Sequence, residues 1–170
     1  MNKNDTFTIM YRILLILTFF QLGISISYGQ KVESWSVKDL EVAIANTKQN
    51  IVVVNFWATY CKPCVEEIPA IVKVVSQNKD SVVLILVNLD ARSIFPNRLA
   101  RFIKKHHFQG VFSWLNETNP NYFCPRMDSS WDGSIPATIM INKRKNIRRF
   151  IGSSISSTQF QELLKALIMG

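Results

Sequence analysis

The chain has 170 residues and a formal net charge of +8, from 20 lysines and arginines against 12 acidic residues. This length suits one domain with a single substantial core, and we expect no linker. Nucleic-acid binding is not expected, because no recognisable nucleic-acid motif accompanies the basic residues. The positive charges gather around a predicted hairpin turn at 142–146 and on a predicted helix at 97–107. Either a solvated surface or a patch that attracts acidic partners would account for them.

The first thirty residues combine a basic start with an apolar stretch. Lys3 and Arg12 precede an uncharged run over 13–30 that is rich in Leu, Ile and Phe. This pattern is typical of a secretory signal peptide, which we place at residues 1–29. An N-terminal membrane anchor is the alternative, because the run approaches the roughly 20 residues that span a bilayer. Either arrangement places residues 30–170 outside the cytoplasm, where disulfides persist.

Apolar runs and turn residues predict alternating helices and strands along the rest of the chain. Ser36 is a typical N-cap residue and predicts a helix over 36–46. Residues 51–56 and 81–89 are almost continuously apolar, as in strands covered on both faces. The helix between them, over 63–77, begins with a proline, which the first turn of a helix tolerates. Because two such strands joined by a helix favour a right-handed crossover, we expect them to be parallel.

The second half of the chain is predicted to end in a hairpin and a helix. The expected elements are, in order, a helix over 97–107, a strand over 110–115, a loop-like insertion over 116–133, strands over 135–142 and 147–151, and a helix over 156–169. Together with the first half, they predict an α/β fold in which a mixed central β-sheet has helices on both faces.

A Cys-x-x-Cys pair, Cys61 and Cys64, follows directly after the apolar strand at 51–56. This spacing places the first thiol at the N-terminus of a helix. Unpaired backbone N–H groups and the helix dipole favour an anion there, so the pKa of Cys61 should fall below that of a free cysteine. Cys64 lies one helical turn further on, where it can attack a mixed disulfide formed at Cys61. The pair therefore predicts thiol-disulfide exchange.

Other uses of these cysteines are less favoured. A zinc site needs about four ligands, and Cys124, His106 and His107 could complete one only by folding together from distant positions. A purely structural disulfide would close too short a loop to constrain the unfolded chain much. Cys124 is expected to be a buried, inert thiol, with a regulatory or intermolecular thiol as the alternative. No metal and no cofactor are expected.

Further residues match a known pattern around the cysteine pair. They are the strand Val52–Thr59, the sequence Cys61-Lys62-Pro63-Cys64, Glu67 and Pro69 just beyond it, and Ser134-Ile135-Pro136-Ala137-Thr138 far downstream. With them the chain resembles the thioredoxin superfamily, specifically the exported TlpA/ResA-like thiol-disulfide oxidoreductases. The resemblance implies a thioredoxin-like fold over residues 30–170. It also implies a cis peptide bond between Ile135 and Pro136 that faces the disulfide and docks an extended substrate.

The resemblance also implies roles for residues near the thiols. Glu67 would be a buried carboxyl whose raised pKa suits it to take the proton from Cys64, the alternative being a solvated helix residue. Cytoplasmic thioredoxins have an aspartate in place of Asn55. The surface around the thiols would be shaped by Trp57, Tyr60, Lys62 and Pro63, of which Trp57 and Tyr60 contact substrate and Lys62 and Pro63 tune the redox behaviour.

These observations predict an exported, periplasmic thiol-disulfide oxidoreductase that reduces disulfides in substrate proteins. An upstream membrane thiol donor would supply its electrons. The first alternative is a Dsb-type oxidase or isomerase, which uses the same thiol chemistry but does not serve to donate electrons to its substrate. A Sco-like metal-handling protein is a more distant alternative, because that group has Cys-x-x-x-Cys. A peroxidase is not favoured, because peroxiredoxins have a threonine three residues before the reactive cysteine and this chain has Ala58.

Overall fold

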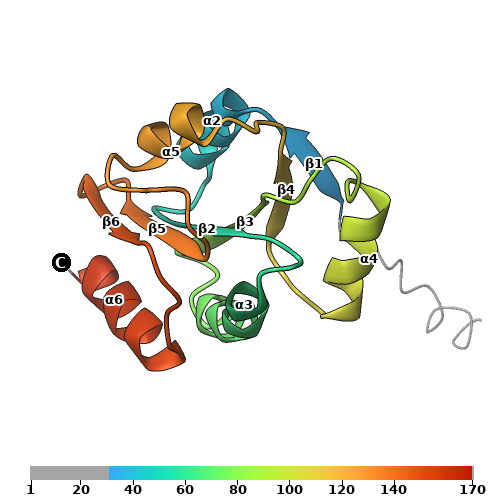
Figure 1. Cartoon of the computed structure of the whole chain (residues 1–170). Helices are drawn as coiled ribbons and strands as arrows, with labels where there is room; N and C mark the ends of the chain where they lie inside the picture. Colours follow the sequence, from blue (N-terminus) through green and yellow to red (C-terminus); the bar gives the residue numbers. More distant parts are fainter. Residues whose placement is uncertain (1–30, 170) are drawn as a thin grey trace, which may run out of the picture.

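The computed structural model describes residues 31–169, which form a six-stranded sheet with helices packed on its two faces (Figure 1). The predicted signal peptide or anchor lies outside the described residues. The elements are, in chain order, β1 (Val32–Trp35), α2 (Val37–Asn46), β2 (Ile51–Trp57), α3 (Lys62–Ser76), β3 (Val82–Asn88), α4 (Asn97–Lys105), β4 (Val111–Leu115), α5 (Pro120–Met127), β5 (Ala137–Asn142), β6 (Ile147–Ile151) and α6 (Ser157–Met169).

The sheet has the order β1-β4-β3-β2-β5-β6. Strand β2 runs parallel to β3, with Trp57 opposite Asn88, and antiparallel to β5, with Phe56 opposite Ala137. Strands β4 and β1 continue the parallel half, and β6 completes a hairpin with β5. The predicted parallel pair and hairpin are therefore both present. This topology brings the ends of β2 and β3 and the start of β5 to one edge of the sheet.

Side chains of β2 alternate between two hydrophobic cores. Val53 and Trp57 belong to the core that α3, α4 and α6 cover, whereas Val54 and Phe56 belong to the core under α2 and α5. Figure 1 shows α2 and α5 on one face of the sheet and α3 and α6 on the other. Because both faces of β2 are covered, all seven of its residues are buried, and its sequence is a nearly continuous apolar run.

Strand β1 was not predicted from the sequence. Its four residues are short for a strand, and only Val32 is buried. It exists because it pairs in parallel with β4, with Val32 opposite Phe112 and Trp35 opposite Leu115. Four residues without a sustained alternation give no periodic signal, so the pairing partner decides the conformation.

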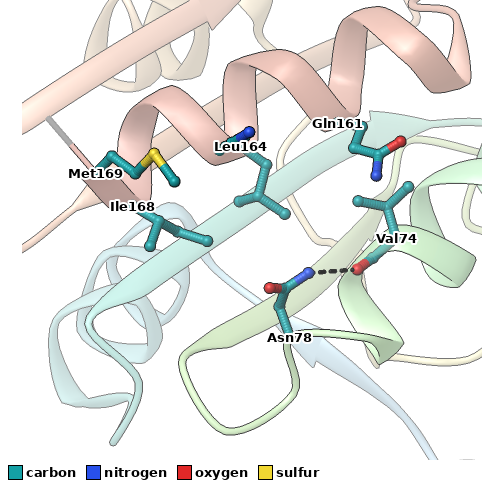
Figure 2. Close-up of a pocket in the computed structure, with 7 residues that line it drawn as sticks. Val74, Asn78, Gln161, Leu164, Ile168 and Met169 are labelled. Carbon is teal, nitrogen blue, oxygen red and sulfur yellow. Dashed lines mark hydrogen bonds between the residues drawn. The ribbon is translucent and has the colours of Figure 1, made fainter.

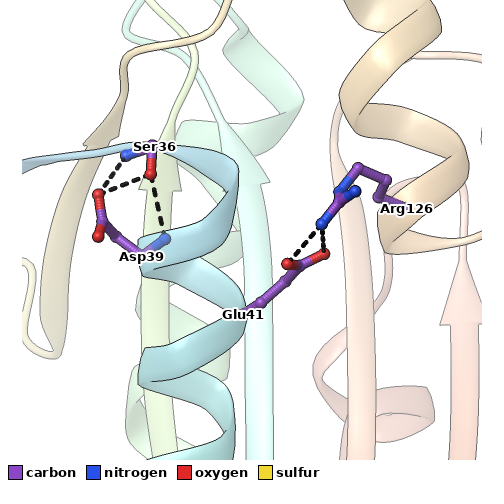
Figure 3. A network of polar contacts seen from close by, with 4 residues as sticks. All are labelled: Ser36, Asp39, Glu41 and Arg126. Carbon is purple, nitrogen blue, oxygen red and sulfur yellow. Dashed lines mark hydrogen bonds and ion pairs between the residues drawn. The ribbon is translucent and has the colours of Figure 1, made fainter.

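The insertion predicted as a loop contains a helix, α5, and the expectation for residues 116–133 is corrected to that extent. Asn119 caps the helix by accepting the backbone N–H of Asn121 at 3.1 Å, and Pro120 occupies the first turn. The turn-rich composition that suggested a loop is thus a helix-start signal. Nη2 of Arg126 in α5 donates to both carboxylate oxygens of Glu41 in α2, which ties the two helices together (Figure 3).

Helix α2 begins as its sequence predicts. The Ser36 side chain accepts the backbone N–H of Asp39 at 3.2 Å, and the Asp39 carboxylate accepts the backbone N–H of Ser36 at 2.9 Å (Figure 3). This reciprocal arrangement is a capping box, which satisfies two backbone donors that a helix N-terminus otherwise leaves unpaired.

Two of the hairpin cations have structural partners. The Lys143 ammonium donates to Thr47 Oγ1 at 2.9 Å, and that of Lys145 donates to the Met169 carbonyl at 2.9 Å. These contacts place positive charge at the ends of α2 and α6, where helix carbonyls favour cations. Part of the predicted cluster of positive charge thus serves to cap the ends of helices within the protein.

No helix among residues 31–169 is both long and apolar enough to cross a bilayer.

Candidate active site

Cys61 and Cys64 form a disulfide at the N-terminus of α3. Cys61 is the N-cap of this helix, and its sulfur accepts the backbone N–H of Cys64 at 3.3 Å. Cys61 is 8% exposed, whereas Cys64 has no exposed surface. An incoming thiol or disulfide can therefore reach only Cys61, and Cys64 can react only with a group already attached there. The predicted roles, with Cys61 as the attacking thiol and Cys64 as the resolving thiol, need such an asymmetry.

The turn that carries Cys61 is held by Asp90, a residue to which no sequence motif pointed. The Asp90 carboxylate accepts both the backbone N–H and the hydroxyl of Thr59, each at 3.0 Å. It also accepts the Asn88 side-chain amide at 2.7 Å. The backbone N–H of Cys61 closes the turn by donating to the Ala58 carbonyl at 3.1 Å. The position of Cys61 thus depends on a carboxylate beyond the end of β3.

The only sequence signal for Asp90 is its place directly after the second of the two predicted parallel strands, and the strand register explains its contact with Thr59. Trp57 is opposite Asn88, so the second residue after β2 lies near the second residue after β3. These two residues are Thr59 and Asp90. Polar residues at the carboxyl ends of neighbouring parallel strands are the positions where functional groups meet in α/β sheets.

Glu67 is buried on α3, one helical turn beyond Cys64, and is 5% exposed. One carboxylate oxygen accepts the Asn55 side-chain amide at 2.9 Å. The other accepts the Ile155 backbone N–H at 2.9 Å and the Ser154 hydroxyl at 3.1 Å. Burial raises the pKa of Glu67, and the three hydrogen bonds oppose that rise only in part. The alternative of a solvated helix residue is therefore wrong.

Asn55 links Glu67 to the strand that follows Pro136. Its amide nitrogen donates to Glu67 and also to the Thr138 hydroxyl, both at 2.9 Å. Asn55 and Thr138 are directly opposite each other in the β2–β5 register, and both are fully buried. The Asn55 carbonyl oxygen has no hydrogen-bond partner among the described residues. An amide at this position supplies N–H donors that an aspartate would not.

The peptide bond between Ile135 and Pro136 is cis. Pro136 is buried and Ile135 is half-buried, immediately before β5. Since β5 begins beside the end of β2, this segment lies at the same edge of the sheet as the cysteine turn. The backbone before it is held by Trp131, whose indole N–H donates to the Ser134 carbonyl at 2.8 Å and whose ring lies 4.5 Å from that of Phe56.

The remaining predicted site residues divide into two groups. Tyr60 is 75% exposed, the Lys62 side chain is 85% exposed, and Pro63 is also exposed, so these three form the rim beside Cys61. Trp57 is different, because it has no exposed surface. Its ring packs 5.6 Å from Phe108 in the core, so the expectation that Trp57 offers surface to a substrate is corrected.

Cys124 is buried and takes no part in the disulfide. Burial, with a smaller contribution from the nearby Asp132, raises the pKa of its thiol, so the reactive thiolate is disfavoured.

His106 stacks on Phe102 with ring centroids 4.2 Å apart. Between residues 31 and 169, no three His, Cys, Asp or Glu side chains are grouped as metal ligands.

A shallow pocket lies where the end of α3 meets α6 (Figure 2). Val74 and Asn78 line it on one side and Leu164 and Ile168 on the other, with a hydrogen bond of 3.0 Å from the Asn78 side chain to the Val74 carbonyl. Val74 is ten residues beyond Cys64 along α3, about 15 Å at the rise of an α-helix. The pocket is therefore separate from the cysteine pair.

Comparisons with known proteins identify the fold and the family. The structure of a thioredoxin-related protein from Neisseria meningitidis serogroup B superposes with a TM-score of 0.61 at 22% identity, over 75% of this chain and 91% of that one. The fold is therefore thioredoxin-like, as predicted. Thiol-disulfide oxidoreductase ResA of Halalkalibacterium halodurans is 23% identical over 143 residues, which cover 82% of this chain and 76% of that protein.

A second curated relative matches a shorter region. Thioredoxin-like protein YneN of Bacillus subtilis (strain 168) is 34% identical over 77 residues, which cover 44% of this chain and 45% of that protein. The matched segment thus spans less than half of YneN. The model of the AhpC/TSA family matches residues 28–150, a range that includes the cysteine pair, Glu67 and Pro136. Because this match covers most of the sequence, the chain belongs to the AhpC/TSA family.

Proposed function

We propose that the protein is an exported thiol-disulfide oxidoreductase that reduces disulfides in substrate proteins. The observation that carries this proposal is the arrangement of the two cysteines. Cys61 caps α3 and keeps 8% of its surface exposed, while Cys64 has none and lies one helical turn before the buried carboxyl of Glu67. Dithiol exchange needs one accessible nucleophile and one protected resolving thiol. The name of the relative ResA supports the same activity.

The reaction begins from the reduced pair. The Cys61 thiolate attacks one sulfur of a substrate disulfide, forms a mixed disulfide and releases the other substrate sulfur as a thiolate. Cys64 then loses its proton and attacks the Cys61 sulfur, which releases the second substrate sulfur. Two electrons pass to the substrate and the Cys61–Cys64 disulfide forms. The helix N-terminus stabilises the thiolate at Cys61.

Glu67 is the proton acceptor for Cys64 in this proposal. Its raised pKa brings the carboxyl closer to the pKa of a thiol, and this makes proton transfer to it less unfavourable. Cys64 has no exposed surface, so bulk water does not compete as an acceptor at its sulfur. Asn55 and the Ile155 backbone orient the carboxylate before the proton arrives.

Substrate would dock at the end of the sheet where the cysteine turn after β2 meets the segment before β5. The half-buried Ile135 precedes the cis bond to Pro136 and offers backbone groups to an extended chain. The exposed Tyr60 ring supplies apolar contact area beside Cys61. Lys62 and Pro63 tune the redox potential, since the residues between the two cysteines surround the attacking sulfur.

Export and electron supply complete the proposal. The pattern of residues 1–29 supports a signal peptide or an anchor, and a periplasmic location follows from it. A reductase there needs electrons from outside its own compartment, so we propose an upstream membrane thiol donor as the partner that returns Cys61–Cys64 to the reduced state.

The reduction potential of the Cys61–Cys64 couple tests the direction. It is measured by equilibration with thiol buffers in a protein that begins at Gln30 and carries Cys124→Ser to remove side reactions. A value near the roughly −270 mV of thioredoxin supports a reductase, whereas one near the roughly −120 mV of DsbA makes the protein an oxidase. Cys61→Ser is expected to abolish reduction of a model disulfide, and unchanged activity would refute the proposed chemistry altogether.

A further inference from the structure

A buried proton acceptor needs a route by which its proton returns to water. In the proposed reaction, each turnover transfers one proton from Cys64 to Glu67. Glu67 is only 5% exposed, so it does not exchange freely with solvent. Unless the proton leaves, the next cycle begins with a protonated carboxyl that cannot accept another.

The partners of Glu67 differ in what they can do with a proton. The Asn55 amide nitrogen and the Ile155 backbone nitrogen are N–H donors and have no free lone pair to accept a proton. The Ser154 hydroxyl, 3.1 Å from Oε2, can both donate and accept. Among the hydrogen-bond partners of Glu67 in the described part of the chain, Ser154 alone can relay a proton.

Ser154 also reaches solvent. Its residue is exposed, although its hydroxyl bonds to a buried carboxylate. The next residue, Ile155, is 6% exposed and belongs to the core under α3 and α6. The backbone N–H of Ile155 bonds to the same Glu67 oxygen at 2.9 Å, so two successive residues of the loop between β6 and α6 hold this oxygen.

We infer that Ser154 is the proton exit of Glu67, an inference that rests on the proposed function. After Cys64 transfers its proton, Glu67 carries it on Oε2 and donates it to Ser154 Oγ. The serine hydroxyl simultaneously passes its own proton to a solvent water, which leaves Glu67 ionised and Ser154 neutral. No electrons move in this step. Ser154 is thus a positioning and relay residue and touches neither sulfur nor substrate in the proposed reaction.

The test compares proton release with thiolate release. The reduced full chain is mixed with dithiobis(nitrobenzoic acid), whose coloured thiolate stays ionised at neutral pH and therefore takes up no proton. Release of the second coloured thiolate reports the attack by Cys64. A pH-indicator dye in weakly buffered solution reports the proton that reaches water with that step.

Three variants isolate the Ser154 hydroxyl. Ser154→Ala removes it, Ser154→Thr keeps it, and Ser153→Ala removes the hydroxyl of the neighbouring exposed serine as a matched control. We expect proton release to coincide with the second thiolate in the unmodified protein, in Ser154→Thr and in Ser153→Ala. In Ser154→Ala the rate of proton release should fall about a hundredfold below that of the unmodified protein, which is the lower end of what a positioned proton-transfer group contributes.

Coincident release in Ser154→Ala overturns the inference. A Glu67→Gln variant separates this failure from failure of the proposed function. If Glu67→Gln slows the second thiolate while Ser154→Ala shows no lag, Glu67 is the acceptor and only the exit through Ser154 is wrong. If Glu67→Gln releases the second thiolate at the normal rate, the acceptor role is wrong and the exit fails with it.

Discussion

Replacing Asp90 with alanine should destabilise the fold strongly, because three donors depend on this one side chain. Its carboxylate accepts the backbone N–H and hydroxyl of Thr59 and the side-chain amide of Asn88, at 2.7–3.0 Å. Asp90 is 5% exposed, so water does not freely replace the lost acceptor. Each buried donor left unpaired costs about 1–3 kcal/mol.

These costs are not additive, because the Thr59 hydroxyl can rotate to another acceptor while its backbone N–H cannot. We therefore expect Asp90→Ala to lose about 3–5 kcal/mol of unfolding free energy. Asp90→Asn keeps one carbonyl oxygen as an acceptor and should lose about 1–2 kcal/mol. The same bonds hold the turn before Cys61, so the alkylation rate of reduced Cys61 should change in both variants.

Urea unfolding of the oxidised protein measures the effect, with Asp80→Ala as the control. Asp80 is an exposed aspartate, and its replacement should cost less than about 0.5 kcal/mol. A loss below about 1 kcal/mol in Asp90→Ala would show that the three hydrogen bonds contribute little, and the assignment of Asp90 as the anchor of the cysteine turn would fail.

Three further changes test other parts of the structure. Burial raises the pKa of Glu67 above 4.5, so the folded state binds its proton more tightly than the unfolded state. The unfolding free energy should therefore fall as pH rises from about 4.5 through the folded pKa, and Glu67→Gln should lack this fall. Urea titrations at several pH values measure it, and the same pH dependence in both proteins would contradict the prediction. Trp131→Phe removes the donor to the Ser134 carbonyl and should lower the unfolding free energy, measured by thermal unfolding, by about 1 kcal/mol. It should also raise the KM for a protein disulfide, and an unchanged KM would show that Trp131 does not position the docking segment. Arg126→Ala breaks an ion pair with Glu41 whose side chains are 42% and 37% exposed. The loss of unfolding free energy should therefore be small and should shrink at high salt, and a large, salt-independent loss would refute a surface pair.

Local patterns in the sequence were sufficient for most secondary structure. The apolar runs of β2 and β3 and the capping residues of α2 depend on neighbours a few positions apart, and they were predicted correctly. Strand β1 was missed because it depends on a partner, β4, about eighty residues away. Helix α5 was missed because prolines and asparagines that start a helix also form turns.

The cysteine pair shows what the sequence alone determined about function. Its position after a buried strand and before a proline-started helix identifies Cys61 as the helix cap, and this follows from residues that are close together in the sequence. The position of Glu67 one turn beyond Cys64 is likewise a consequence of helical spacing. Local sequence is therefore enough to predict dithiol chemistry at this helix terminus.

Tertiary structure decided which other residues belong to the site. Asp90 meets Thr59 from 31 residues away, and Ser154 meets Glu67 from 87 residues away. Trp57 adjoins the cysteine turn in sequence, yet it is buried in the core because helices cover both faces of β2. Sequence spacing fixes contacts only within one helix or strand, whereas the sheet order and the packing of helices on it determine which distant polar groups share a buried environment.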